Sequence, residues 1–282
     1  MKAYSSKLPK DYPIAIKPMG EIAGYPVRPG MFDINGVTVL PRGVNFTIHT
    51  HYGNYCELLL FHRGEAEPYA VLPFPDEYKI GDVYSMIVFN LDISEFEYAY
   101  RLDGPYQPEK GLLFNKENVI LDPYARAIAG WRGWGDRKVG AYHARVVEDK
   151  FDWGDMPQSN REMCDLVIYE LHVRGFTRHP SSGVEHRGTF AGLMEKIPYL
   201  KELGVNAVEL MPIFEFDEMR DVREVDGQRL LDYWGYNPVG FFAPNTSYAA
   251  TEEYNHEGRE LKELIKALHD NGIEVILDVV FN

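Results

Sequence analysis

Hydrophobic and polar residues alternate along the first part of the chain. The alternating or apolar runs have the length of β-strands, and they predict strands at residues 44–48, 56–61, 83–89 and 96–102. Turns that carry Pro or Gly separate these runs, and no long helical stripe interrupts them. Short strands spaced by turns are typical of a two-layer antiparallel fold. We therefore expect an immunoglobulin-like β-sandwich at residues 21–130, after an N-terminal extension at residues 1–20.

From residue 166 the pattern changes to strand, helix, strand, after a junction at residues 131–165 that has weak periodicity. Three apolar runs predict strands at residues 166–171, 205–211 and 273–281. A first helix is marked by apolar residues at helical spacing, namely Phe190, Leu193, Ile197 and Leu200. Gly204 is placed to end it, and a second helix is predicted at residues 261–268. This alternation implies a parallel sheet with right-handed crossovers, in a doubly wound fold or a (β/α)8 barrel.

The last predicted strand ends with the sequence at Asn282. A strand buried on both faces needs neighbours on both sides, and an open edge invites pairing with another chain. Three strands and two helices are also too few to close a barrel. We therefore expect either that these residues are the first part of a longer barrel-forming protein, or that something else covers the last strand. Self-association through the open barrel edge would provide such a cover.

Charge and composition narrow the class of protein. With 29 basic and 43 acidic residues the formal net charge is −14, which argues against nucleic acid and an anionic membrane surface as partners. No run approaches the ~20 apolar residues of a membrane span, and no secretory signal is visible. Cys56 and Cys164 match no metal-ligand spacing, and two free thiols agree with a cytoplasmic location. A neutral sugar would suit this charge.

The predicted connection at residues 212–257 is the first place to look for a site. It is far longer than a βα link needs, and it leaves the carboxyl end of its strand, where parallel α/β folds build their sites. Tyr233, Trp234 and Tyr236 offer flat rings that could stack on a pyranose, and Asn237 could hydrogen-bond its hydroxyls. We take these four as candidate substrate-binding residues. The alternative is that the rings only fasten the loop to the rim of the fold.

Other polar residues lie near the ends of the predicted strands. Asp278 interrupts an apolar strand and must be paired or hydrogen-bonded, and Asn282 lies on the same face by period two. We take both as supporting active-site residues, with a purely structural carboxylate as the alternative. The acids at residues 215–218 could serve glycoside chemistry, but a solvated acidic loop is the favoured interpretation. The histidines show no metal-ligand spacing and no Gly-rich phosphate loop occurs, so we predict no metal and no cofactor.

Together and in this order, these segments resemble the α-amylase superfamily of glycoside hydrolases (family 13), and specifically its isoamylase-type glycogen debranching branch. The stretches that carry the resemblance are residues 167–177, 208–218, 232–244 and 278–282. The last of them is similar to the family's first signature motif without its closing His. Residues 121–128, with the predicted sandwich before them, resemble carbohydrate-binding module family 48.

The resemblance implies a TIM barrel, of which residues 166–282 would supply the first three strands and two helices. It implies an α-glucan substrate, such as glycogen, starch or limit dextrin, cleaved at α-1,6 branch points with retention. Tyr236 matches the family's sugar-stacking tyrosine, and Asp278 and Asn282 match supporting residues. The family's catalytic carboxylates come from later strands, so we assign no catalytic residue and expect these 282 residues alone to be inactive. The alternatives are a non-catalytic α-glucan-binding or scaffold protein, a branching enzyme and a trehalose-releasing relative.

Overall fold

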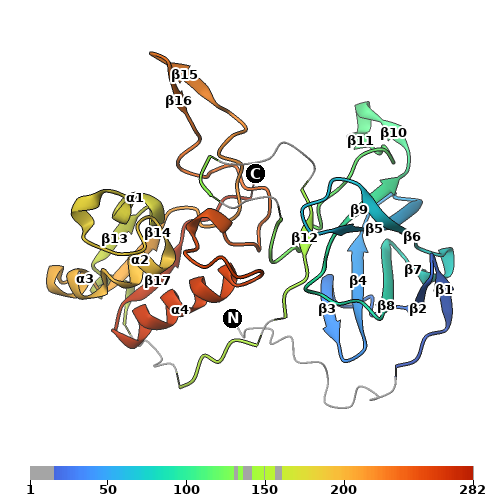
Figure 1. Ribbon diagram of the computed structural model, residues 1–282, viewed down its shortest axis with the longest axis horizontal. Helices are drawn as coiled ribbons and strands as arrows, with labels where there is room; N and C mark the ends of the chain where they lie inside the picture. The colour runs from blue at the N-terminus through green and yellow to red at the C-terminus, as the bar shows by residue number, and fades with distance from the viewer. Residues whose placement is uncertain (1–15, 130–132, 136–141, 149, 156–160, 282) are drawn as a thin grey trace.

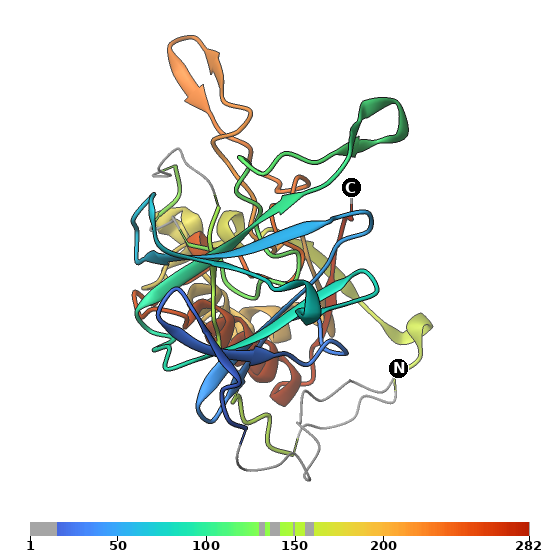
Figure 2. The ribbon, with the colours of Figure 1, turned by 90° about the vertical axis from the view of Figure 1, so that its right-hand side faces the viewer.

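We analysed a computed structural model, which describes residues 16–129, 133–135, 142–148, 150–155 and 161–281. The molecule has two parts that lie side by side, a β-sandwich and an α/β unit (Figure 1). A hairpin from the α/β unit stands out from the body of the molecule (Figure 2). Among the described residues, no helix combines the length and the apolar character that crossing a membrane would require.

Two antiparallel sheets form the sandwich, which confirms the prediction from the alternating residues. The first sheet has the order β1 (Gly20–Ile22), β2 (Tyr25–Pro29), β8 (Val83–Phe89), β4 (Gly43–His49), β3 (Gly36–Leu40), with β7 (Lys79–Ile80) beside β8. The second has the order β12 (Ala144–Arg145), β9 (Phe96–Asp103), β5 (Tyr55–His62), β6 (Pro68–Pro73). A small separate hairpin pairs β10 (Tyr106–Gln107) with β11 (Leu112–Leu113). β12 comes from the segment between the two predicted domains and pairs with β9.

The core between the two sheets is built from every second residue of their central strands. Phe46 of β4 and Leu58 of β5 are fully buried in one cluster with Tyr98 of β9. The rings of Phe46 and Tyr98 meet edge to face, with centroids 5.3 Å apart. Burying one such large apolar side chain contributes roughly 1.5–3 kcal/mol, so a cluster of this kind fixes how the two sheets pack.

A parallel sheet in the order β13 (Ile168–Leu171), β14 (Ala207–Leu210), β17 (Glu274–Leu277) is the centre of the second part. The first two strands are connected through α1 (Val173–Arg178), α2 (Phe190–Met194) and α3 (Ile197–Leu203), and α4 (Glu257–Asp270) leads into the third. The apolar faces of the helices bury Phe190, Leu200 and Leu264 in one cluster with Val208. The connection between β14 and α4 includes the projecting hairpin β15 (Arg223–Val225) and β16 (Gln228–Leu230).

The helices between the first two strands differ from the sequence prediction. The single helix expected from Phe190 to Gly204 is two helices, because Pro198 cannot donate a helical hydrogen bond and is accommodated in the first turn of α3. Gly204 ends α3 with φ of +84°, as expected. The six-residue helix α1 was missed because it is too short to show a period. His172 caps its N-terminus by accepting a hydrogen bond from the Gly175 N–H.

The third strand is also shorter than predicted, since β17 ends at Leu277 and not at residue 281. Its partner β14 ends at Leu210, and the last ladder bond runs from the Asp278 N–H to the Leu210 carbonyl at 3.0 Å. Asp278 therefore lies one position past the strand, at the carboxyl end of the sheet.

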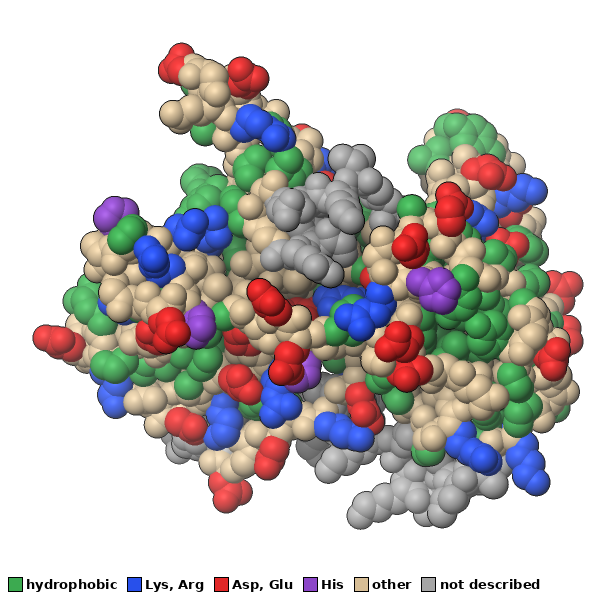
Figure 3. All heavy atoms as spheres, viewed as in Figure 1, with side chains coloured by type: hydrophobic (Ala, Val, Ile, Leu, Met, Phe, Trp, Pro, Cys, Tyr) green, Lys and Arg blue, Asp and Glu red, His purple; other side chains and the backbone are tan. Residues whose placement is uncertain are grey.

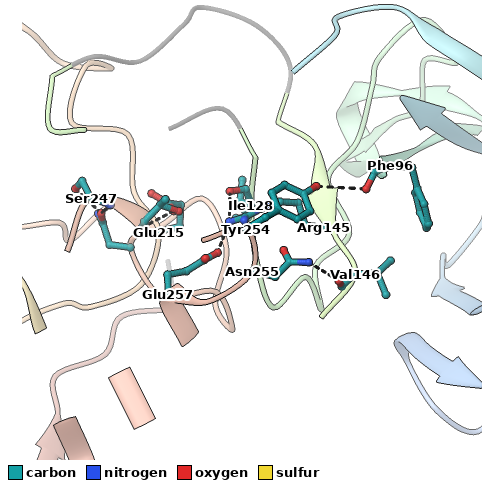
Figure 4. Close-up of polar contacts among 11 residues, drawn as sticks. Phe96, Ile128, Arg145, Val146, Glu215, Ser247, Tyr254, Asn255 and Glu257 are labelled. Carbon is teal, nitrogen blue, oxygen red and sulfur yellow. Dashed lines mark hydrogen bonds and ion pairs between the residues drawn. The ribbon is translucent and has the colours of Figure 1, made fainter. Parts of the chain in front are cut away.

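A buried ion pair joins the sandwich to the α/β unit (Figure 4). The Arg145 guanidinium on β12 binds the Glu257 carboxylate at the start of α4, and the two side chains are only 6% and 5% exposed. Tyr254 lies beside the pair, with its ring centroid 5.0 Å from the guanidinium carbon. Asn255 Nδ2 donates to the Val146 carbonyl at 2.8 Å. The residues at and just before the start of α4 thus join the two parts through polar contacts.

We expect Glu257→Ala to lower the free energy of unfolding by about 3 kcal/mol, because the substitution leaves the Arg145 charge buried without its partner. Urea unfolding followed by circular dichroism measures this change. Arg259→Ala is the matched control on the same helix, since it breaks the exposed Arg259–Glu263 pair and should cost under about 1 kcal/mol. Equal losses in the two variants would contradict a joining role for the buried pair.

Candidate functional site

Residues 233–237, here called the aromatic loop, lie against the carboxyl ends of the parallel strands. The Tyr236 hydroxyl donates a hydrogen bond to Asp278 Oδ2, immediately after β17. This bond, together with partial burial, raises the pKa of Tyr236 to about 12. The phenol therefore stays protonated and keeps donating at neutral pH. Asp278 is hydrogen-bonded, as its place in an apolar segment requires, and the structure brings together two predicted site residues that are 42 positions apart.

The loop turns its other rings in different directions. Gly235 has φ of +80° and lies directly on Phe216, where an added Cβ would be only 2.6 Å from the ring, so no other residue fits. Trp234 is 62% exposed and meets Tyr236 edge to face at 6.3 Å between centroids. Tyr233 instead stacks on His172, with centroids 4.2 Å apart. Tyr233 therefore fastens the loop, while Trp234 is free to meet a ligand.

His172 is the polar anchor of this loop. Its Nδ1 accepts from the Gly175 N–H at 3.0 Å, so the ring proton is on Nε2, which donates to the Tyr233 carbonyl at 2.6 Å. Burial lowers the pKa of His172, and the neutral ring is the form that can make both bonds. These contacts give His172 a structural role.

Further ring contacts hold Tyr233 and the loop in place. Trp134 meets Tyr233 edge to face at 5.9 Å and lies parallel to Tyr248 at 6.3 Å. The Arg174 guanidinium covers the Trp134 ring at 4.5 Å from its centroid. These contacts join residues from three distant segments, so the aromatic loop is held in one place before any ligand arrives.

The acidic segment at residues 215–218 is not a solvated loop, which corrects the favoured interpretation. Glu215 and Glu218 are fully buried. Glu215 Oε2 accepts from the Thr246 N–H at 2.9 Å and from the Thr246 hydroxyl at 2.6 Å, and Glu218 Oε1 accepts from the Gly135 N–H at 2.7 Å. The segment faces inward because backbone N–H groups of neighbouring loops need acceptors there.

Desolvation raises the pKa of Glu215 to about 8, and the Glu257 carboxylate adds to this effect while Arg145 and the bonds from Thr246 oppose it. Glu215 is therefore a largely protonated, structural acid at neutral pH. Because Glu215 is fully buried and bonded to Thr246, it supports the fold and does not meet a substrate.

An open cavity of about 500 Å3 lies beside the aromatic loop, within the ~300–1,000 Å3 typical of small-molecule sites. Its lining includes all four candidate substrate-binding residues, Tyr233, Trp234, Tyr236 and Asn237. It also includes Arg223 and Leu230 from the projecting hairpin, which the sequence reading missed. The signal that could have found the hairpin is Asp226-Gly227, whose φ values of +52° and +74° form a tight hairpin turn.

The remaining candidate residues are less closely tied to the site. Asn237 lines the cavity, and its Oδ1 accepts from Arg220 at 3.4 Å. Asn282 lies outside the described residues. Within the described ranges, no group of three or more His, Cys, Asp or Glu residues could hold a metal ion.

The family model described as alpha amylase, catalytic domain, matches residues 153–282. The model described as carbohydrate-binding module 48, the isoamylase N-terminal domain, matches residues 35–125. The chain belongs to the α-amylase superfamily. Its sandwich is the carbohydrate-binding module 48, and its α/β unit is part of the catalytic domain, as the resemblance predicted.

Named relatives of this α-amylase superfamily chain agree with the two matches. Isoamylase 1, chloroplastic, of Arabidopsis thaliana is 39% identical over 268 residues, which are 88% of this chain and 34% of that protein. The glycogen debranching enzyme of Yersinia enterocolitica is 36% identical over 264 residues, 85% of this chain and 38% of that protein. The crystal structure of apo pullulanase from Paenibacillus barengoltzii has a TM-score of 0.69 and 25% identity, over 89% of this chain and 38% of that chain. The chain spans about a third of the length of the curated relatives it matches.

The buried acid Glu215 gives this part of the fold a pH dependence that can be measured. Unfolded Glu215 ionises above about pH 4.5, whereas the folded group stays protonated up to about pH 8, so its contribution to the free energy of unfolding falls as the pH rises between these values. The fall is at most about 1.4 kcal/mol per pH unit.

We therefore expect the thermal midpoint of Glu215→Gln, relative to the native chain, to rise steadily from pH 5 to pH 8. Differential scanning calorimetry at several pH values measures this difference, and Asp122, whose pKa is raised to about 6, contributes equally to both proteins. Glu252→Gln, an exposed change on the same connection, should show no such trend. A midpoint difference that does not depend on pH would contradict a protonated Glu215.

Proposed function

We propose that this chain is the substrate-orienting part of a debranching hydrolase that acts on α-1,6 branch points of glycogen- or starch-type glucans. The observation that carries the proposal is Tyr236 fixed by Asp278 beside an open cavity lined by Trp234 and Asn237. A flat ring, an exposed indole and amide groups suit a pyranose, whose apolar face stacks while its hydroxyls find polar partners. Relatives named isoamylase, glycogen debranching enzyme and pullulanase support the same class of substrate.

The residues of this chain would bind and orient the sugar. Tyr236 stacks on the glucose beside the scissile bond, and Asp278 fixes the orientation of its ring. Asn282 is proposed as a second supporting residue. Retaining hydrolysis needs a carboxylate nucleophile and a carboxyl acid about 5 Å apart, one attacking the anomeric carbon and one protonating the leaving oxygen. The resemblance assigns neither role to a residue of this sequence, so we expect residues 1–282 to bind α-glucan without cleaving it.

Affinity electrophoresis in gels that contain glycogen tests this proposal. We expect glycogen to retard the native chain. For Tyr236→Ala we expect the dissociation constant for glycogen to rise about tenfold, because stacking of a sugar face on an aromatic ring contributes on the order of 1 kcal/mol or more. Tyr199→Ala on α3 is the control, because it removes a half-exposed tyrosine of the α/β unit that does not line the cavity. A reducing-sugar assay on glycogen and pullulan should stay at background.

The outcomes separate the candidate functions. Equal retardation of the native chain and Tyr236→Ala would favour the alternative, a non-catalytic glucan-binding protein that acts through its carbohydrate-binding module. No retardation of the native chain would contradict glucan binding. Robust release of reducing sugar by the purified chain, free of contaminating enzyme, would contradict the expectation that these residues lack the catalytic pair.

We also propose self-association through the edge of the parallel sheet. Within the described residues β17 pairs on one side only, with β14, and it is followed by the exposed side chains of Val279 and Phe281. We expect light scattering to show a mass above that of the monomer, and Val279→Lys to restore the monomer because a lysine at an edge opposes pairing. Leu113→Lys, on the sandwich hairpin, should leave the mass unchanged. A native chain that stays monomeric at high concentration would overturn this proposal.

A further inference from the structure

The hairpin β15–β16 stands out from the body, with all six of its strand residues exposed (Figure 3). A hairpin that buries no side chain contributes little to the core, and an isolated two-stranded hairpin is only marginally stable in water. Its exposed apolar side chains, Val225 and Leu230, are about half accessible to solvent.

The register of the hairpin shows which face is directed at the cavity. Arg223 is paired with Leu230 across the two strands, so their side chains share one face. Glu224 is paired with Arg229, and these two side chains lie on the opposite face. The cavity beside the aromatic loop is lined by Arg223 and Leu230 but not by Glu224 or Arg229. One face of the hairpin therefore forms part of the wall of the cavity.

We propose that this wall is a carbohydrate subsite, in which Arg223 and Leu230 hold an α-1,4-linked segment of the glucan against Trp234. The inference rests on the proposed function, because it adds contacts to the same cavity. Trp234 supplies an exposed indole face for one sugar ring, and Leu230 covers the apolar edge of the bound glucan. The Arg223 guanidinium, which has no hydrogen bond or ion pair within the described part of the protein, supplies a planar set of donors for hydroxyl groups.

The charges around the subsite favour a neutral ligand with many hydroxyls. Asp221 and Asp232 also line the cavity and add acceptors beside the donors of Arg223 and Asn237. An anionic ligand would meet these carboxylates, and a wholly apolar one would leave their charges without partners. An oligosaccharide offers both donors and acceptors at every ring and satisfies both kinds of group.

The test uses the full chain labelled with 5-fluorotryptophan and titrated with maltotetraose, followed by fluorine NMR. The chain has four tryptophans, and the Trp234→Phe variant identifies the resonance of Trp234. We expect this resonance to shift on titration. Arg223→Ala should raise the dissociation constant about tenfold, because it removes a charge-assisted hydrogen bond, and Leu230→Ala should raise it about threefold. Arg229→Ala removes the same charge from the opposite face of the same hairpin and should leave the dissociation constant unchanged.

Each outcome bears on the proposal. A shift of Trp234 with equal dissociation constants for Arg223→Ala, Leu230→Ala and the native chain would show that the hairpin is not part of the subsite. Equal weakening by Arg223→Ala and Arg229→Ala would indicate a general effect of charge and would overturn the assigned face. A Trp234 resonance that stays in place, while glycogen still retards the native chain more strongly than Tyr236→Ala, would refute the subsite without refuting the proposed function.

Discussion

Three buried glutamates hold the long connection between β14 and α4, and the rest of the site depends on them. Glu215 accepts from Thr246, Glu218 accepts from Gly135, and Glu260 accepts from the Ala250 and Thr251 N–H groups at 2.9–3.0 Å. A loop that runs through the interior must find partners for its backbone N–H groups, and a carboxylate can serve two or more of them at once. The raised pKa of Glu215 is the electrostatic cost of this arrangement.

The same connection also joins the two parts of the molecule. Its last residues, Tyr254 and Asn255, contact the backbone of the sandwich, and Glu257 completes the junction with Arg145. Arg145 and Glu257 in turn influence the pKa of Glu215, at the other end of the same connection. The sandwich and the α/β unit are therefore joined through buried polar groups, and not only through their apolar cores.

The sequence predicted the architecture well because each layer has its own hydrophobic period. The alternation around Phe46 and the helical spacing around Leu264 reflect burial on one face, which local pattern records directly. It failed where tertiary contacts decide the outcome. The inward direction of Glu215 follows from the backbone of Thr246, 31 residues away. The split at Pro198 is instead a local effect of the missing N–H, which the apolar spacing alone does not record. The predicted aromatic residues do line one cavity, yet the hairpin that completes it has no hydrophobic pattern of its own.

Neighbouring rings in the aromatic loop have different roles: some anchor the loop and one is exposed to a ligand. Their order in the sequence does not reveal which ring has which role. Tyr233 is fixed on His172 through both its ring and its carbonyl, whereas Trp234 is largely exposed. Binding that must order a flexible loop loses affinity to the entropy of ordering, and a site held in advance avoids much of that loss. Because Tyr233, Gly235 and Tyr236 are each anchored to a different part of the fold, Trp234 is presented at a fixed position while it stays largely exposed. The anchored residues Tyr233, Gly235 and Tyr236 thus determine where Trp234 can meet a ligand.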